Sequence, residues 1–487
     1  MSFSEIEKVR IEKLKKLKKA GIDPFPAKVR RTYFCQEVKD NFENLEKEEV
    51  VLCGRLKTIR LHGKSCFAHL TDESGEIQIY LKEDILGKKN YKIFTDLIDI
   101  GDFIEASGTL MKTRTGEKTV VLNKFRVISK SLLPLPEKWH GLEDIEVRYR
   151  KRYLDLIANP EVREIFRKRS LIIQIIRKFF LEQNFLEVET PILQPIPGGA
   201  AAKPFITHHD ALGIDLYLSI APELYLKRLI IAGYEKVFEI TRCFRNEGID
   251  WAHNPEFSQV EFYQAYADYH DLMNLTEKFF VYLFEKLRIS YKVKFRDKEI
   301  NFRPPYSRKK FIEAIKEFSG LDLEKLREQK EIYQAAKKLN LAVQKNWSWP
   351  KIVDEIFKEC VRTKIENPTF IINYPIEISP LAKRTPDNPN YVERFQLLAG
   401  GFELCNAFSE LNDPFDQEER FKAQLELKKA GEEEAQMYDK DFIEALKYGL
   451  PPTAGCGIGI DRLVAILTGQ RSIKEVILFP ILKPKEK

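Results

Sequence analysis

The pattern of hydrophobic and polar residues divides the chain into a short helical start, a β-rich region and a long mixed region. Residues 4–20 are predicted to form one helix, because apolar residues recur at helical spacing among lysines until Gly21 and Pro24 end the pattern. Residues 50–130 hold five runs rich in strand-forming residues, with a short helical stretch after the third run. This is the layout of a five-stranded OB-fold β-barrel, a common binder of single-stranded nucleic acid, although a small unrelated β-barrel fits the pattern equally well.

The remainder of the chain alternates predicted strands and helices. A proline-punctuated linker comes first, and a long amphipathic helix follows at 163–183. The alternation then predicts an α+β domain on a mostly antiparallel sheet with flanking helices and a helical insertion at about 306–365. The pattern therefore predicts four parts: a basic N-terminal helix within 1–31, the barrel at 50–131, the linker at 132–160 and the large domain at 161–487.

Composition and cysteine usage narrow the class of protein. Hydrophobic residues make up 44% and charged residues 32%, which excludes a disordered or collagen-like chain. No apolar run approaches the length of a membrane-spanning helix, and the N-terminus lacks the apolar region of a secretory signal. The seven cysteines form no CxxC pair, which favours free thiols over a disulfide framework or a zinc site. We therefore expect a cytoplasmic protein without a membrane partner.

The positive charge is concentrated at the N-terminus. Residues 1–31 hold ten Lys or Arg against four Asp or Glu, a surplus of six that equals the net charge of +6 for the whole chain. A basic front on a neutral body indicates an anionic partner for the N-terminal third. A solvated lysine-rich helix explains the same charge equally well.

A cluster of polar residues stands out within residues 237–266, which are predicted as strand, polar loop and strand. Strand alternation places Arg245 and Glu247 on one face of the first strand and Phe257, Glu261 and Tyr263 on one face of the second. Buried carboxylates cost several kcal/mol unless they are paired, so their retention points to a charged ligand. A salt-bridged hairpin is the alternative.

Two further segments accompany this cluster. Residues 177–193 form a predicted helix that runs into a short strand ending at Pro191, and residues 455–469 form a Gly-x-Gly-x-Gly run that enters a helix through Asp461 and Arg462. The spacing is not that of the dinucleotide-binding GxGxxG, and no Rossmann unit surrounds it. Glycines allow a ligand to approach the backbone closely, and the helix N-terminus adds a positive dipole.

These three segments resemble motifs 1, 2 and 3 of the class II aminoacyl-tRNA synthetases, while the class I signatures are absent. The similarity covers nearly the whole chain. Within the class, the lysine-specific enzymes are the most similar, as shown by the segments GGAAAKPFITHH (198–209), APELYLKRL (221–229), FRNEGIDWAHNPEF (244–257) and NAFSELNDP (406–414).

The resemblance implies an ATP-dependent lysine–tRNA ligase on a class II catalytic domain. Such an enzyme activates lysine with ATP to lysyl-adenylate and transfers the lysyl group to the 3′ end of tRNA(Lys). It also implies Mg²⁺ as a cofactor and a homodimer formed through the motif 1 region. Orientation and charge neutralisation by Arg245, Arg462 and Mg²⁺ are expected to supply most of the rate, so no nucleophile or catalytic triad is needed.

The resemblance also implies roles for individual residues. Arg245 is expected to hold the substrate carboxylate and the α-phosphate. The ATP site is then expected to comprise Arg245, Glu247, His253, Phe257, Glu403 and Arg462, with adenine between Phe257 and Arg462. The lysine site is expected to comprise Gly199, Glu223, Arg245, Glu261, Tyr263, Asn406, Phe408 and Glu410. The metal is expected at Glu403 and Gln396, and the anticodon at Arg60, Phe67 and Gln78.

Three positions qualify these expectations. Glu403 has the opposite strand parity to Asn406, so it needs a β-bulge or belongs to a second site. Gln396 stands seven positions before Glu403, where the family usually has an acid, and its amide oxygen offers Mg²⁺ no charge. Lys124 stands in the fifth predicted strand, where many relatives have glutamate.

Two other functions remain open. A tRNA-independent lysyltransferase that acts on a protein would resemble the large domain, but such relatives lack the anticodon barrel. A catalytically inactive RNA-binding paralogue would be expected to lose Arg245, Glu247 or Arg462, and all three are present.

Overall fold

The structure is a computed structural model that describes residues 4–136, 142–432 and 434–484. The chain divides into two compact units, Met1–Glu143 and Asp144–Lys487. Residues 137–141 of the predicted linker lie outside the described residues. Its later part folds into helices α5 (Ile145–Arg150) and α6 (Arg152–Ala158), and α5 begins where the Asp144 carboxylate accepts hydrogen bonds from two backbone amides. Within the described residues, no helix has both the length and the apolarity to cross a membrane.

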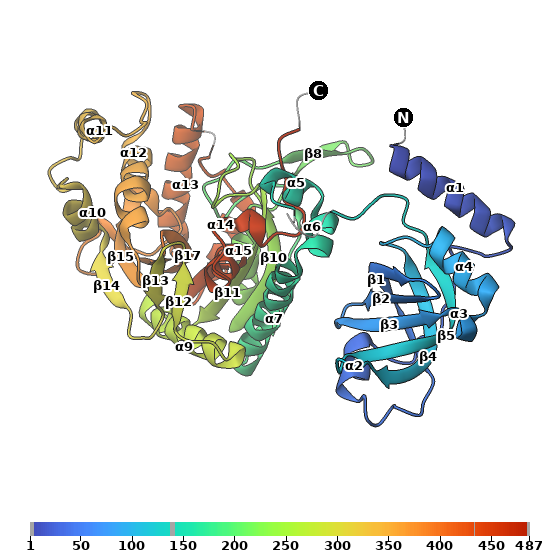
Figure 1. Cartoon of the computed structure of the whole chain (residues 1–487). Coiled ribbons are helices and arrows are strands. Elements are labelled where there is room, and N and C mark those ends of the chain that lie inside the picture. Colours follow the sequence, from blue (N-terminus) through green and yellow to red (C-terminus); the bar gives the residue numbers. More distant parts are fainter. Residues whose placement is uncertain (1–3, 137–141, 433, 485–487) are drawn as a thin grey trace. The chain divides into compact units, whose positions relative to one another are not determined.

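The first unit is built on five strands that pair in the order β1-β2-β3-β5-β4, with β4 pairing back to β1. The strands are β1 (Val50–His62), β2 (Ser65–Thr71), β3 (Glu76–Lys82), β4 (Phe103–Lys112) and β5 (Lys118–Ser129). The remaining elements of this unit are the helices α1 (Glu5–Lys19), α2 (Cys35–Asp40), α3 (Glu83–Leu86) and α4 (Lys88–Leu97). Alternate strand residues fill the interior, as in the burial of Cys66, Ala68 and Leu70 along β2. The predicted five-stranded barrel with a helix after the third strand is confirmed (Figure 1).

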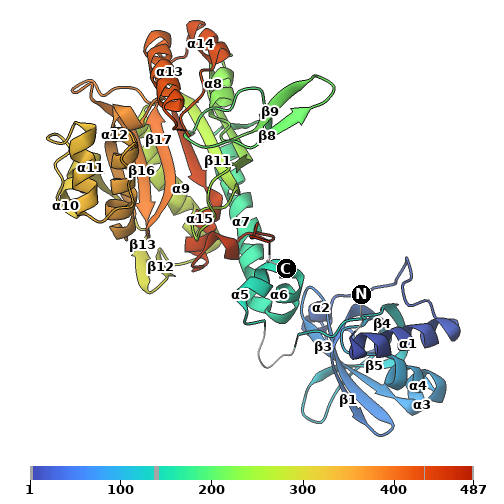
Figure 2. The ribbon, with the colours of Figure 1, turned by 90° about the horizontal axis from the view of Figure 1, so that it is seen from above.

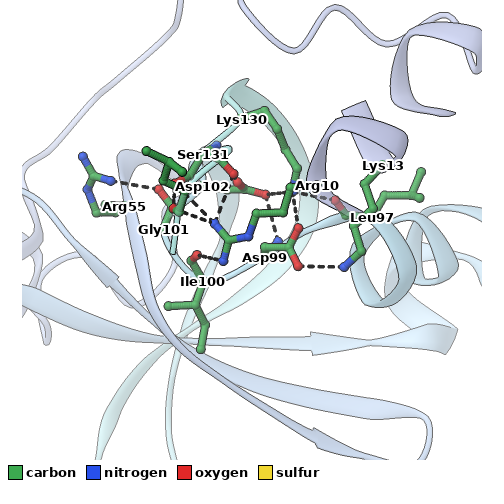
Figure 3. Close-up of polar contacts among 11 residues, drawn as sticks. Arg10, Lys13, Arg55, Leu97, Asp99, Ile100, Gly101, Asp102, Lys130 and Ser131 are labelled. Carbon is green, nitrogen blue, oxygen red and sulfur yellow. Dashed lines mark hydrogen bonds and ion pairs between the residues drawn. The ribbon is translucent and has the colours of Figure 1, made fainter. Parts of the chain in front are cut away.

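Helix α1 packs on this barrel through the buried Leu17. It is also held by polar groups, which Figure 3 shows. Arg10 is 8% exposed and donates hydrogen bonds to the carbonyl oxygens of residues 100, 131 and 133 at 3.0–3.1 Å. Lys13 and the fully buried Lys130 both pair with Asp99, at 2.7 and 2.5 Å. Part of the N-terminal positive charge is therefore bound within the unit. The exposed lysines of α1 include Lys15, Lys16, Lys18 and Lys19.

The second unit is built on an eight-stranded sheet in the order β14-β15-β16-β17-β18-β11-β10-β6. The strands are β6 (Leu186–Glu187), β10 (Lys236–Phe244), β11 (Glu256–Ala265), β14 (Ser307–Lys310), β15 (Thr369–Pro375), β16 (Tyr391–Ala399), β17 (Phe402–Ser409) and β18 (Thr453–Gly459). Only the two edge pairs, β14–β15 and β6–β10, are parallel, so the predicted mostly antiparallel sheet is confirmed. Two smaller sheets join β12 (Lys292–Phe295) to β13 (Lys298–Asn301), and β7 (Leu193–Gln194) and β8 (Ile206–His209) to β9 (Ile214–Leu218).

Three groups of helices surround this sheet (Figures 1 and 2). The group that shares the main hydrophobic core with the sheet comprises α7 (Pro160–Glu182), α9 (Tyr269–Leu287) and α15 (Ile460–Leu467). A second core joins β11 and β10 to α8 (Glu223–Ile231), α13 (Pro414–Lys429) and α14 (Lys440–Lys447). A third core holds α10 (Phe311–Ser319), α11 (Gln329–Lys338), α12 (Trp349–Ile356) and the π-helical turn η1 (Phe357–Val361). Single turns complete the set: η2 (Arg362–Lys364), η3 (Ile376–Ile378) and η4 (Ile473–Glu475).

The predicted helical insertion at 306–365 contains the third group of helices. Its first residues differ from the prediction, because residues 307–310 form the edge strand β14, which pairs in parallel with β15. This short polar segment is a strand rather than a helix because it hydrogen-bonds to the edge of the sheet. The pattern of residues within the segment gives no sign of this pairing.

Candidate active site

The central strands of the large sheet place apolar residues on one face and the residues that line a cavity on the other. On β11, Val260 and Phe262 enter the main core, while the odd-numbered residues from 257 to 263 line a cavity of about 410 Å³. On β18, the residues between the glycines enter the same core, so Gly455, Gly457 and Gly459 form bare backbone at the cavity. A Cβ atom on Gly455 would lie 2.2 Å from Cε1 of Tyr263, so only glycine fits there.

Nearly all the residues predicted for ATP, lysine and metal meet in this one cavity. Those lining it are Gly199, Glu223, Arg245, Glu247, His253, Phe257, Glu261, Tyr263, Gln396, Glu403, Asn406, Phe408 and Arg462. Glu410 lies directly behind the wall: its Oε1 would be 2.5 Å from a Cβ atom on Gly455, which itself lines the cavity.

One end of the cavity is acidic. Glu223, Glu261 and Glu410 are each at most 5% exposed, and the Tyr263 hydroxyl donates a 2.7 Å hydrogen bond to Oε1 of Glu261. Burial, followed by the nearby charge of Glu223, raises the pKa of Glu261 to about 8. Burial likewise raises the pKa values of Glu223 and Glu410 above the ordinary range of a carboxyl group. A bound cation would favour the ionised forms, so this end suits an ammonium group.

Sequence reasoning missed Lys227, which reaches these acids from α8. Its side chain is fully buried, and its Nζ lies 2.6 Å from Oε1 of Glu223 and forms a second ion pair with Oε2 of Glu410. The spacing of four residues between Glu223 and Lys227 on one helix was an available signal for the first pair.

Arginines and an aromatic ring also line the cavity. The prediction that Arg245 and Glu247 lie on one face of a strand is wrong, because β10 ends at Phe244 and both residues follow it in a loop. The guanidinium carbon of Arg245 lies 5.0 Å from the ring centroid of Phe257. The buried Nε of Arg245 has no hydrogen-bond partner within the described residues, which leaves a donor for a ligand. Arg462 donates from Nη1 to the backbone oxygen of Glu403 at 3.1 Å, and burial lowers the pKa of its guanidinium.

The start of α15 is tied to the neighbouring strand and helix. Oδ2 of Asp461 accepts a 2.8 Å hydrogen bond from the backbone amide of Ser258, and its Oδ1 pairs with Arg169 at 2.6 Å. Asp461 therefore holds Arg462 beside β11, where Phe257 lies.

The loop between β10 and β11 is ordered by Asp250, which sequence reasoning did not single out. Its carboxylate accepts from the backbone amides of residues 252 and 253 at 2.6 and 2.7 Å, and lies 2.8 Å from Nδ1 of His253. Burial, followed by the charge of Arg462, lowers the pKa of His253. Burial raises the pKa of Glu247.

The predicted metal ligands come from two neighbouring strands. The pairing of β16 with β17 shifts by one residue between Leu397–Cys405 and Leu398–Glu403, which is the bulge that the parity of Glu403 requires. Gln396 pairs with Asn406 instead, and its Oε1 accepts a 3.0 Å hydrogen bond from Tyr374. No group of three or more acids, histidines or cysteines able to hold a metal occurs among the described residues. This oxygen set fits Mg²⁺ only when the ion brings further oxygen ligands, as a nucleotide would supply.

The predicted anticodon residues lie on the outer face of the barrel. Phe67 pairs across the sheet with Arg60 on one side and Tyr80 on the other, and its ring centroid is 4.6 Å from that of Tyr80. Gln78 lies on the same strand face as Tyr80 but is 8% exposed, with its amide bonded to Glu117 and to the Thr119 hydroxyl, each at 2.8 Å. Arg60 and the stacked rings of Phe67 and Tyr80 are therefore more accessible to a base than Gln78. Tyr80 is a further candidate for anticodon binding, and the alternation of side chains along the strand already placed it on the same face as Gln78.

Comparisons with known proteins agree with both units. Residues 144–483 match the family model described as tRNA synthetases class II (D, K and N), and residues 50–128 match the model described as OB-fold nucleic acid binding domain. The chain is 52% identical over 484 residues to the lysine–tRNA ligase of Carboxydothermus hydrogenoformans, with 99% of each chain aligned. It is 51% identical over 486 residues to that of Pelotomaculum thermopropionicum, covering 99% of this chain and 96% of the relative. It is 50% identical over 484 residues to that of Thermoanaerobacter pseudethanolicus, covering 99% and 97%.

Proposed function

The chain belongs to the class II tRNA synthetases of the D, K and N group, and from this premise we propose that it activates lysine with ATP and transfers the lysyl group to the 3′ end of tRNA(Lys). The observation that carries the choice of lysine is the acidic end of the cavity, where Glu223, Glu261 and Glu410 are all buried. An aspartate or asparagine side chain would add no positive charge to these carboxylates, of which Glu223 and Glu410 already share the single ammonium of Lys227.

The proposed chemistry needs orientation and charge neutralisation rather than a nucleophilic side chain. The lysine carboxylate attacks the α-phosphorus of ATP, and the bond from that phosphorus to pyrophosphate breaks. The terminal hydroxyl of tRNA then attacks the carbonyl carbon of the adenylate, and AMP leaves. Arg245 is proposed to hold the reacting carboxylate and α-phosphate, with Arg462 adding positive charge nearby. Mg²⁺, held by Glu403 and by the nucleotide, would neutralise phosphate charge.

The remaining roles are proposals supported by position in the cavity. Glu223 would receive the α-ammonium beside the backbone of Gly199, where a Cβ atom would lie 2.7 Å from that of Glu223. Glu410 and Tyr263, with Glu261 next to them, would receive the ε-ammonium. Asn406 and Phe408 would form the wall between the two ends. Adenine would lie between Phe257 and Arg462, with Glu247 at its amino group and His253 near the terminal phosphates.

Partners beyond the substrates are also proposals. Exposed apolar side chains along the motif 1 region support a homodimer formed there: Leu181 is 50%, Leu186 46%, Ile192 38% and Leu193 47% exposed. The outer face of the barrel, with Arg60 and Phe67, is proposed to bind the anticodon. A cytoplasmic location stays a prediction.

The experiment that tests the function is ATP–pyrophosphate exchange measured with each of the twenty amino acids. We expect exchange to depend on lysine, because a site built around buried carboxylates loses orders of magnitude with uncharged isosteres. Robust exchange with aspartate or asparagine while lysine is inert would overturn the assignment. Charging of tRNA(Lys) in the same preparation excludes an inactive paralogue and a protein-modifying transferase.

A second experiment tests the metal site. Gln396→Glu is expected to lower the Mg²⁺ concentration that half-saturates exchange by about fivefold or more. Two opposite unit charges about 4 Å apart attract each other by about 1 kcal/mol even in water, and residue 396 is buried. The substitution keeps an acceptor for the Tyr374 hydroxyl, so the local hydrogen bond is retained. An unchanged Mg²⁺ titration would show that residue 396 is not a ligand.

A further inference from the structure

Lys227 forms buried ion pairs with both of the acids that are proposed to bind the ammonium groups of lysine. Nζ of Lys227 contacts Glu223 on its own helix and Glu410 at the end of β17, so one ammonium group holds both carboxylates. The ring centroids of Phe408 and Phe442 lie 5.4 and 5.8 Å from this Nζ, on β17 and α14. The ammonium is therefore confined by three elements and has little freedom to move.

Each carboxylate gives Lys227 one oxygen and keeps the other. Glu223 contacts Lys227 through Oε1 while the residue itself lines the cavity. Glu410 contacts it through Oε2, and its Oε1, which has no hydrogen-bond partner within the described residues, lies against the bare backbone of Gly455 at the cavity wall. Lys227 therefore orients both carboxylates so that one oxygen of each remains for a ligand.

The buried acids outnumber the cations that reach them. Glu223 and Glu410 share the ammonium of Lys227, and the charge of Arg394 also acts on Glu223, while Glu261 is held by two neutral donors, the Tyr263 hydroxyl and the Gln259 amide. This excess of acids favours a ligand that brings positive charge, as the ammonium groups of lysine do, while the carboxylate of the substrate faces Arg245. Without Lys227 the excess would be larger, and the acids would take up protons or bind ligand in other positions.

We propose that Lys227 is a positioning residue that fixes the distance between the two ammonium-binding carboxylates and so sets the length of the diamino acid that is activated. The inference rests on the proposed function, because it assigns the α-ammonium to Glu223 and the ε-ammonium to Glu410. Lys227 itself does not line the cavity, so it acts on the substrate through these two side chains.

The test is ATP–pyrophosphate exchange with lysine and with ornithine, which is one methylene shorter. In Lys227→Met we expect KM for lysine to rise at least about tenfold and the preference for lysine over ornithine, as the ratio of kcat/KM values, to shrink by about tenfold. KM for ATP should stay within about twofold of the wild-type value, because Lys227 makes no contact with Arg245, Phe257 or Arg462, the side chains proposed to hold ATP. A general loss of structure would not change the ratio of kcat/KM values for lysine and ornithine while leaving KM for ATP unchanged.

The matched control is Lys130→Met in the barrel unit. Lys130 is also fully buried and also joins two acids, Asp99 at 2.5 Å and Asp102 at 2.7 Å (Figure 3). This variant should lower thermal stability and leave the lysine-to-ornithine preference unchanged.

Lys227→Arg keeps the positive charge in the core. If Lys227→Met does not fold, this second variant tests whether Lys227 sets the preference for lysine over ornithine. Its larger planar head alters the spacing of the two carboxylates, so the preference for lysine should again shrink. An unchanged preference in whichever of the two variants is folded overturns the inference. That result would leave the proposed function intact, whereas absence of lysine-dependent exchange in the wild-type protein would remove the proposed function itself.

Discussion

Glu410→Gln is expected to lower kcat/KM for lysine in the exchange reaction by about 10³-fold or more, because the ε-ammonium would meet a neutral amide in a dry site. The substitution keeps the size of the side chain, which is 1% exposed, so packing against Gly455 and Tyr263 is conserved. Lys227 also loses one of its two anionic partners, which adds to the loss. The measurement is exchange kinetics with lysine and ATP varied separately, and KM for ATP should change little.

Glu277→Gln is the matched control in the same unit. Glu277 lies on α9 outside the cavity lining, and its carboxylate accepts a 2.7 Å hydrogen bond from the backbone amide of Tyr306, which an amide oxygen can also accept. Its kinetics should remain within about twofold of the wild type, as for most substitutions away from a site. If Glu410→Gln kept lysine activation within tenfold of the wild-type value, Glu410 would not be the partner of the ε-ammonium.

The parts of the site that could be predicted are those governed by strand alternation. The period of two places Phe257, Glu261 and Tyr263 on one face whatever the rest of the fold does, and the structure shows them lining one cavity. The same rule predicts either a bulge or a second site at Glu403, and the pairing of β16 with β17 contains a bulge. Local backbone geometry carries this information, so a single sequence is sufficient to read it.

Contacts between distant segments could not be predicted in this way. Lys227 meets Glu410 only because α8 packs beside the end of β17, and no local pattern records that approach. Arg10 looks like any other cation of a lysine-rich helix, yet its guanidinium is buried against carbonyl oxygens of the barrel unit. Gln78 resembles an available base-reading amide, but Glu117 and Thr119 already bind it. In each case tertiary packing decides whether a polar group is available to a ligand.

Phe67→Ala is expected to weaken charging of tRNA(Lys) by roughly 5- to 150-fold, since a stacked base is worth about 1–3 kcal/mol. The ring is partly exposed on the outer face of the barrel, beside Arg60 and against Tyr80, so its removal takes away one surface on which an anticodon base can stack. Lysine activation uses no tRNA, so the exchange rate should remain near the wild-type value. The measurement is exchange and aminoacylation in parallel, with tRNA(Lys) and an anticodon-altered transcript, and the variant should lose most of its preference between the two RNAs.

The control for this prediction is a variant with Lys15, Lys16, Lys18 and Lys19 neutralised. These lysines are exposed on α1 and make none of the Arg10 and Lys13 contacts that hold the helix to the barrel, so the unit should remain folded. Their contacts with RNA are expected to be electrostatic, so both RNAs should bind more weakly and the dependence of binding on salt should become less steep. Two results together would separate recognition of a base from attraction to the phosphate backbone. Only Phe67→Ala should lose the preference for tRNA(Lys) over the altered transcript, and only the lysine variant should show a reduced salt dependence. If Phe67→Ala slowed exchange as much as charging, the ring would serve the stability of the barrel, and its role in recognition would have to be abandoned.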